Sequence, residues 1–115
     1  MKKSDQCRAL LTASILFVTK DGTLEPEILK CFRKCLKIAS SVLDIALQLQ
    51  LYVEILSHLT LYVRYKNEDI DEIICSLIKQ INEKNNDTPL SELANKQFQN
   101  SLVFFRKSGM NIGAE

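Results

Sequence analysis

The chain has 115 residues, with 46% hydrophobic and 25% charged residues, so it is long enough for one domain and has the composition of a folded protein rather than a disordered one. Its net charge of +1 gives no support to nucleic-acid binding, which usually requires a strong basic excess. Three glycines and two prolines are too few for the turns of a β-rich domain, so long helices are expected.

The first predicted helix runs from about Ser4 to Thr19, where apolar residues recur at intervals of three and four. Ser4 is its expected N-cap, because a serine hydroxyl can accept a hydrogen bond from an unpaired amide of the first turn. The sequence KDGT at residues 20–23 should end this helix.

The second predicted helix runs from about Leu24 to Val42, with Pro26 in its first turn and an apolar face that includes Phe32 and Cys35. The opposite face carries a basic strip, formed by Lys30, Arg33, Lys34 and Lys37. Such a strip could contact acidic lipid or protein, although most strips of this kind only face solvent.

The third predicted helix runs from about Asp44, its expected N-cap, to Lys66. Its apolar side chains cover an arc wider than a surface helix needs, which indicates packing on more than one side. The remaining edge is mostly polar and is spaced 4, 3, 4, 3 along the chain: Gln50, Glu54, Ser57, Leu61 and Arg64.

The fourth predicted helix runs from about Glu68 to Glu83, with Asn67 as its cap. Its apolar stripe is the clearest in the chain and consists of Ile70, Ile73, Ile74, Leu77, Ile78 and Ile81. We expect this stripe to be buried against the third and fifth helices.

The fifth predicted helix begins with Thr88 as N-cap and Pro89 at the first helical position, and it ends near Gly109. Its expected apolar face comprises Leu90, Leu93, Ala94, Phe98, Leu102 and Phe105. Residues 110–115 are expected to form a flexible tail.

The predicted fold is therefore all-α, with about five helices in antiparallel hairpins because the connections are short. A closed bundle and a stack of hairpins both satisfy this pattern. The wide apolar arc of the third helix favours a stacked, HEAT-like α-solenoid segment over residues 1–109, although no clean internal repeat is present.

The four cysteines do not indicate a metal or redox site. Cys31 and Cys35 are one helical turn apart, a geometry that does not readily allow a disulfide, and Cys7 and Cys75 belong to other helices. The single histidine, His58, has no nucleophile at a suitable spacing, and no phosphate-binding loop is present. We therefore expect no enzyme activity, no metal, no cofactor and no small-molecule substrate.

The location of the protein is expected to be cytoplasmic. The residues Met1 to Lys3 resemble the start of a secretion signal, but the polar residues Ser4, Asp5, Gln6 and Arg8 interrupt any apolar core. No apolar run approaches the roughly 18 residues needed to cross a bilayer.

Several stretches resemble the vacuolar protein sorting-associated protein 35 family, the large solenoid subunits of retromer. These stretches are DQCRALL (5–11), CFRKCLKIASSVLDIALQLQLYVEILSHL (31–59), YKNEDID (65–71) and LIKQINE (77–83). The similarity runs through about residues 5–105 and corresponds to the extreme C-terminal part of the family. The start at Met1, in the middle of the family pattern, favours a fragment of a longer chain.

The resemblance implies a HEAT-like solenoid in a coat on the cytosolic face of endosomes, which sorts cargo to the trans-Golgi network or the plasma membrane. It implies one partner, the phosphoesterase-fold retromer subunit (vacuolar protein sorting-associated protein 29), and only indirect membrane association. The loop TKDGTLEP (19–26) is shorter than is usual in the family, and the tail after Arg106 does not follow the family.

The polar edge of the third helix is the expected contact for this partner, because the first, third and fifth helices should line one side of the stack. Contact with solvent alone is the competing interpretation of that edge. A free-standing regulatory helical bundle is the alternative for the whole chain. A solenoid fragment should leave an apolar flank on the first helix, whereas a closed bundle should not.

Overall fold

The computed structural model describes residues 2–14, 26–62 and 68–109, and helices account for most of them. In chain order these helices are α1 (Lys3–Ser14), α2 (Pro26–Ser40), α3 (Ile45–Leu59), α4 (Glu68–Asn85) and α5 (Glu92–Lys107). No strand occurs among these described residues. The predicted all-α fold is confirmed.

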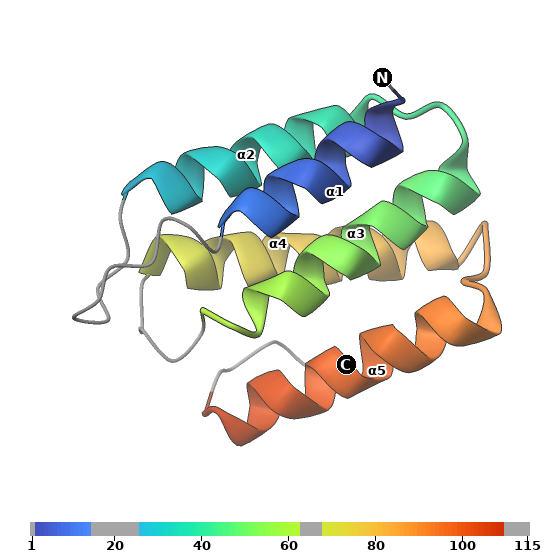
Figure 1. Cartoon of the computed structure of the whole chain (residues 1–115). Helices are drawn as coiled ribbons and strands as arrows, with labels where there is room; N and C mark the ends of the chain where they lie inside the picture. Colours follow the sequence, from blue (N-terminus) through green and yellow to red (C-terminus); the bar gives the residue numbers. More distant parts are fainter. Residues whose placement is uncertain (1, 15–25, 63–67, 110–115) are drawn as a thin grey trace.

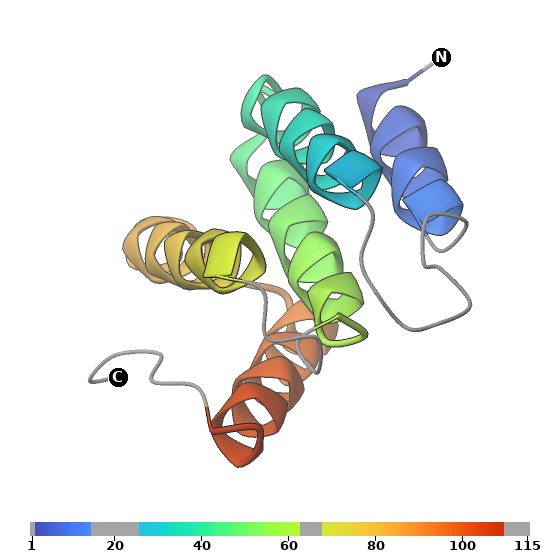
Figure 2. The ribbon, with the colours of Figure 1, turned by 90° about the vertical axis from the view of Figure 1, so that its left-hand side faces the viewer.

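The helices lie in two layers, with α1, α3 and α5 side by side in one and α2 and α4 in the other (Figures 1 and 2). Successive helices run in opposite directions, as in stacked hairpins. The shortest dimension of the molecule is 20 Å, against 42 and 37 Å for the other two, which matches a slab two helices thick.

The central position of α3 explains why apolar residues cover such a wide arc of this helix. α3 contacts each of the other four helices. Leu51, Val53, Ile55 and Leu56 point in several directions around the helix, and all are fully buried. Beyond its end, the ring of Tyr62 packs edge-on against Phe32 of α2, with ring centroids 5.5 Å apart. The core therefore runs from one layer to the other through α3.

The apolar stripe of α4 is buried as predicted. Its six members, Ile70, Ile73, Ile74, Leu77, Ile78 and Ile81, are each at most 8% exposed. α4 packs chiefly on α3, and α5 contributes little to its burial, so of the two predicted neighbours only the third helix is confirmed as a main contact.

Two predicted helix-terminal residues are confirmed by their geometry, and α4 begins at Glu68 as predicted. Asp44 caps α3, since its Oδ1 accepts hydrogen bonds from the amides of Ala46 and Leu47 at 3.0 and 3.4 Å. Gly109 follows the end of α5 with a φ of +86°, a left-handed conformation that favours glycine.

Other predicted ends are wrong. Ser4 lies inside α1, which already begins at Lys3. Thr88 and Pro89 do not start α5, whose N-cap is Ser91. The residues before Ser91 instead continue from the end of α4: the Thr88 amide donates to the Lys84 carbonyl at 2.9 Å, and the Leu90 amide donates to Asn85 Oδ1 at 2.9 Å.

The third helix is shorter than predicted, because α3 ends at Leu59 and turns at Thr60, whose amide and hydroxyl both donate to the Ser57 carbonyl. The predicted cap Asn67, the KDGT break at residues 20–23 and the tail at 110–115 lie outside the described residues.

The exposed apolar side chains do not lie where the sequence predicted. Leu93, expected on the buried face of α5, is 69% exposed. Among the described residues of α1 no large apolar side chain is exposed, so the predicted flank is not seen there. Val103 and Phe104 of α5 are instead 45% and 46% exposed, at the other end of the stack.

Candidate protein-binding edge of helix α3

Four of the five residues predicted to bind a partner are described, and they lie on or just after α3. Gln50 and Leu61 are exposed, whereas Glu54 and Ser57 are half-buried. Arg64 lies outside the described residues. We call the four described residues the α3 edge: Gln50, Glu54, Ser57 and Leu61.

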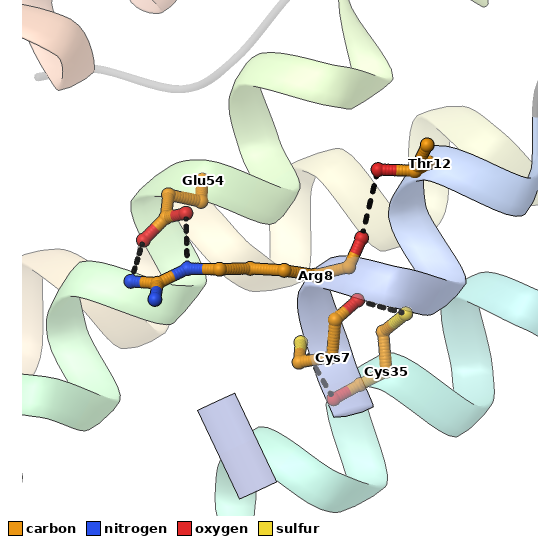
Figure 3. A network of polar contacts seen from close by, with 5 residues as sticks. All are labelled: Cys7, Arg8, Thr12, Cys35 and Glu54. Atoms are coloured by element: carbon orange, nitrogen blue, oxygen red, sulfur yellow. Dashed lines mark hydrogen bonds and ion pairs between the residues drawn. The ribbon is translucent and has the colours of Figure 1, made fainter. Parts of the chain in front are cut away.

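Glu54 joins α3 to α1 through a bidentate ion pair with Arg8 (Figure 3). Arg8 Nε donates to Glu54 Oε1 at 2.9 Å, and Arg8 Nη2 donates to Oε2 at 3.0 Å. The Glu54 carboxylate raises the pKa of the Arg8 guanidinium through these hydrogen bonds and its charge. The two side chains are 44% and 25% exposed, so the pair stabilises the fold by only about 0–1 kcal/mol.

Ser57 joins α3 to α5 on the other side. Its hydroxyl lies 3.4 Å from the hydroxyl of Ser101, which is 4% exposed and also donates to the Gln97 carbonyl at 3.1 Å. The α3 edge is thus flanked by α1 at Glu54 and by α5 at Ser57, and both neighbours are polar. The sequence pattern did not identify Arg8 or Ser101, because each belongs to a different helix.

Gln50 borders a surface hollow of about 270 Å³ between the first turns of α3 and the start of α5. Leu47, Leu90 and Ala94 are among the residues that line it, together with the cap residues Asp44 and Ser91. The hollow has the size and mixed lining to admit one side chain of a protein partner. Periodicity alone could not identify it, because part of its wall, Pro89, Leu90 and Ser91, comes from the α4–α5 connection.

Leu61 lies in the turn after α3 and is 51% exposed. Its neighbours in sequence, Thr60 and Tyr62, are half-buried and buried. An exposed leucine held between anchored residues is available to a partner without a cost in ordering the backbone.

A second polar residue of α3, Gln48, has a structural role. It is 4% exposed, and its Nε2 donates to the carbonyls of Ala39, Ser40 and Val42 at 3.2, 3.0 and 3.4 Å. These carbonyls lie at or just after the end of α2, where helix carbonyls run out of intrahelical partners, and the Ala39 carbonyl also accepts from the Val42 amide at 3.1 Å. Gln48 therefore caps α2 from within the core.

Cys7 and Cys35 meet in the seam between α1 and α2 (Figure 3). Each is fully buried, and each thiol donates to the carbonyl of the other residue, at 3.7 Å from Cys7 and 3.6 Å from Cys35. Contact with the Cys7 side chain and burial raise the pKa of the Cys35 thiol well above its ordinary value. All four cysteines of the chain are free thiols. The sequence had drawn attention to Cys31 and Cys35 instead.

His58 is half-buried near the end of α3, and its Nδ1 has no hydrogen-bond partner. Burial lowers the pKa of its imidazole, against a smaller opposing effect of the Glu54 charge. Among the described residues, no three His, Cys, Asp or Glu side chains are grouped so that they could hold a metal ion. Within the same part of the chain, no helix is both long and apolar enough to span a bilayer.

Comparison with known protein families identifies a match over most of the chain. The family model described as vacuolar protein sorting-associated protein 35 matches residues 1–84, which include α1 to α3 and nearly all of α4. The α3 edge lies within this matched region, whereas α5 lies beyond it.

Proposed function

The chain belongs to the vacuolar protein sorting-associated protein 35 family, and on that premise we propose that it binds the phosphoesterase-fold subunit of retromer through the α3 edge. The family consists of non-catalytic scaffold subunits of retromer, which acts in protein transport. In this proposal the chain is a scaffold segment of the coat on endosomes, for transport to the Golgi or the plasma membrane.

One observation carries the choice of surface: Leu61 is 51% exposed at the end of a helix whose other large apolar residues are mostly buried. Gln50 is exposed on the same helix, beside the hollow between α3 and α5. An apolar contact surrounded by polar groups is the usual composition of a protein interface. Arg64 is included in the proposed contact because the spacing of the sequence places it on the same edge as the other four residues.

Leu61→Asp tests the proposal, because an aspartate buried without a partner at an interface is costly. We expect it to weaken binding of the purified phosphoesterase-fold subunit by at least about tenfold, or about 1.4 kcal/mol, in calorimetry. The matched control is Leu43→Asp, since Leu43 is 94% exposed in the α2–α3 connection. Lys34→Glu on α2 is a second control, and both controls should bind like the unchanged protein.

Unchanged affinity of Leu61→Asp would contradict the proposed surface, as would a loss that appears only in Lys34→Glu. The alternative function, a free-standing regulatory bundle, is favoured by the lack of an exposed apolar flank on the described part of α1. Complete absence of binding by the unchanged protein would support that alternative.

A further inference from the structure

The connection between α4 and α5 contains a sequence motif that the fold does not use. Thr88 and Pro89 have the chemistry of a helix start, yet α5 is capped by Ser91. Pro89 is one of two prolines in the chain, and the other, Pro26, follows a glutamate. Thr88 is therefore the only serine or threonine of the sequence that directly precedes a proline. This dipeptide is the acceptor motif of proline-directed protein kinases.

The Thr88 hydroxyl is free to react. It forms no hydrogen bond within the described part of the chain, and its oxygen reaches solvent although the residue as a whole is half-buried. Every other serine or threonine that the structure describes outside the helices has its hydroxyl in a hydrogen bond with the backbone: Ser41, Thr60, Ser91 and Ser108. Thr88 alone in this group can receive a phosphoryl group without losing a hydrogen bond of its side chain.

The backbone around Thr88 can enter the cleft of a kinase. A residue before a proline is held away from the helical conformation and toward the extended one, in which kinases bind their substrates. Two hydrogen bonds hold residues 88–90 to the end of α4: the Thr88 amide donates to the Lys84 carbonyl, and the Leu90 amide donates to Asn85 Oδ1, each at 2.9 Å. Because each such bond contributes little to net stability, the segment can leave α4 while the helices stay folded.

The motif lies at the edge of the hollow between α3 and α5. Pro89, Leu90 and Ser91 line this hollow together with Asp44, the N-cap of α3, and Thr88 is the next residue along the chain. The α4–α5 connection and the first turn of α3 lie at the same end of the slab (Figure 1). A phosphate on Thr88 would thus add about two negative charges at the edge of a hollow that already contains a carboxylate.

We propose that Thr88 is phosphorylated by a proline-directed kinase and that the phosphate closes the hollow to a protein partner. In this reaction the Thr88 hydroxyl oxygen forms a bond to the γ-phosphorus of ATP, and the bond from that phosphorus to ADP breaks. The hydroxyl proton passes to the catalytic base of the kinase, and ADP leaves with magnesium. A phosphate in an interface beside an acidic residue opposes binding, because like charges repel and the dianion loses its hydration.

The closing of the hollow rests on the function proposed above, because Gln50 of the α3 edge borders the hollow. The phosphorylation itself does not depend on that function. The two parts of the proposal are therefore tested by separate measurements.

The site is tested by incubating the full chain with Mg-ATP and an active mitogen-activated protein kinase. The chain should gain one phosphoryl group, and mass spectrometry of its peptides should place this group on Thr88. Thr88→Val, which keeps the shape but lacks the hydroxyl, should lose the incorporation, as should Pro89→Ala, which keeps the hydroxyl but lacks the proline. Thr88→Ser should retain it. Circular dichroism melts check that each variant is folded.

Two results of this assay would overturn the site. One is undiminished incorporation into Thr88→Val, since the acceptor would then lie elsewhere. The other is no incorporation into the unchanged chain while the same kinase preparation phosphorylates a standard peptide.

The closing of the hollow is tested by calorimetry with the purified phosphoesterase-fold subunit. The phosphorylated chain should bind at least about tenfold more weakly than the unmodified chain, whereas kinase-treated Thr88→Val should bind like the unmodified chain. Equal affinity of the phosphorylated and unmodified chains would overturn the closing of the hollow. Absence of binding by the unmodified chain would overturn it together with the proposed function, and the mass measurement would still decide the phosphorylation site.

Discussion

Ile74→Ala measures whether the stripe of α4 forms the core of the fold. Ile74 lies on the apolar stripe of α4 and is fully buried. The substitution removes three carbon atoms, and at about 0.8 kcal/mol for each buried methylene the lost transfer free energy is about 2.4 kcal/mol. A cavity of about 80 Å³ that does not collapse would add about 2 kcal/mol, at ~24 cal/mol per Å³. The expected loss of unfolding free energy therefore lies between about 2.4 and 4.4 kcal/mol.

Urea denaturation followed by circular dichroism measures this loss. Ile74→Val provides a graded change and should cost only about 0.5–1.5 kcal/mol. Leu93→Ala removes a similar volume from a side chain that is 69% exposed, and it should stay within about 0.5 kcal/mol of the unchanged protein. If Ile74→Ala has the same midpoint as Leu93→Ala, the stripe does not lie in the core and the packing of α4 on α3 is wrong.

Three further predictions concern the other buried groups. Gln48→Glu should destabilise the fold by about 1–3 kcal/mol, because it replaces the amide that donates to three carbonyls by a carboxylate. Gln48→Lys, which keeps a donor, should lose less unfolding free energy in the same urea assay. Native and non-reducing mass spectrometry should show no bound zinc and no disulfide, and a mass lower by two hydrogens would contradict the absence of a disulfide. Iodoacetamide should label the exposed Cys75 before the fully buried Cys7 and Cys35. Burial lowers the pKa of His58, so the unfolded chain binds a proton at a higher pH than the folded chain does. The free energy of unfolding should therefore fall as pH drops through about 6.5, and this fall should be less steep in His58→Gln.

The helices could be predicted from the sequence because their signals are local. The isoleucine stripe of α4 and the wide apolar arc of α3 follow from spacing along one helix, and their burial agrees with the pattern. Helix ends were less predictable, because capping groups compete. Thr88 and Pro89 have the right chemistry to start a helix, but Asn85 holds Leu90 in the turn after α4, and Ser91 becomes the cap.

The candidate site was predictable only as one side of a single helix. The spacing of Gln50, Glu54, Ser57 and Leu61 placed them on a common edge, but it could not show which side chains lie opposite. Arg8 and Ser101 are more than forty positions away from their partners along the chain, and only packing of α1 and α5 on α3 brings them together. The meeting of Cys7 with Cys35 depends on tertiary structure in the same way.

The Arg8–Glu54 pair changes how charge on the α3 edge acts on a partner. Glu54 is not a free carboxylate, because a bidentate guanidinium already neutralises it, and a partner that approaches the edge meets a paired dipole. The apolar contact at Leu61 should therefore contribute more to affinity than Glu54 does, and replacement of Glu54 alone should act mainly through the Arg8 charge that it leaves unpaired.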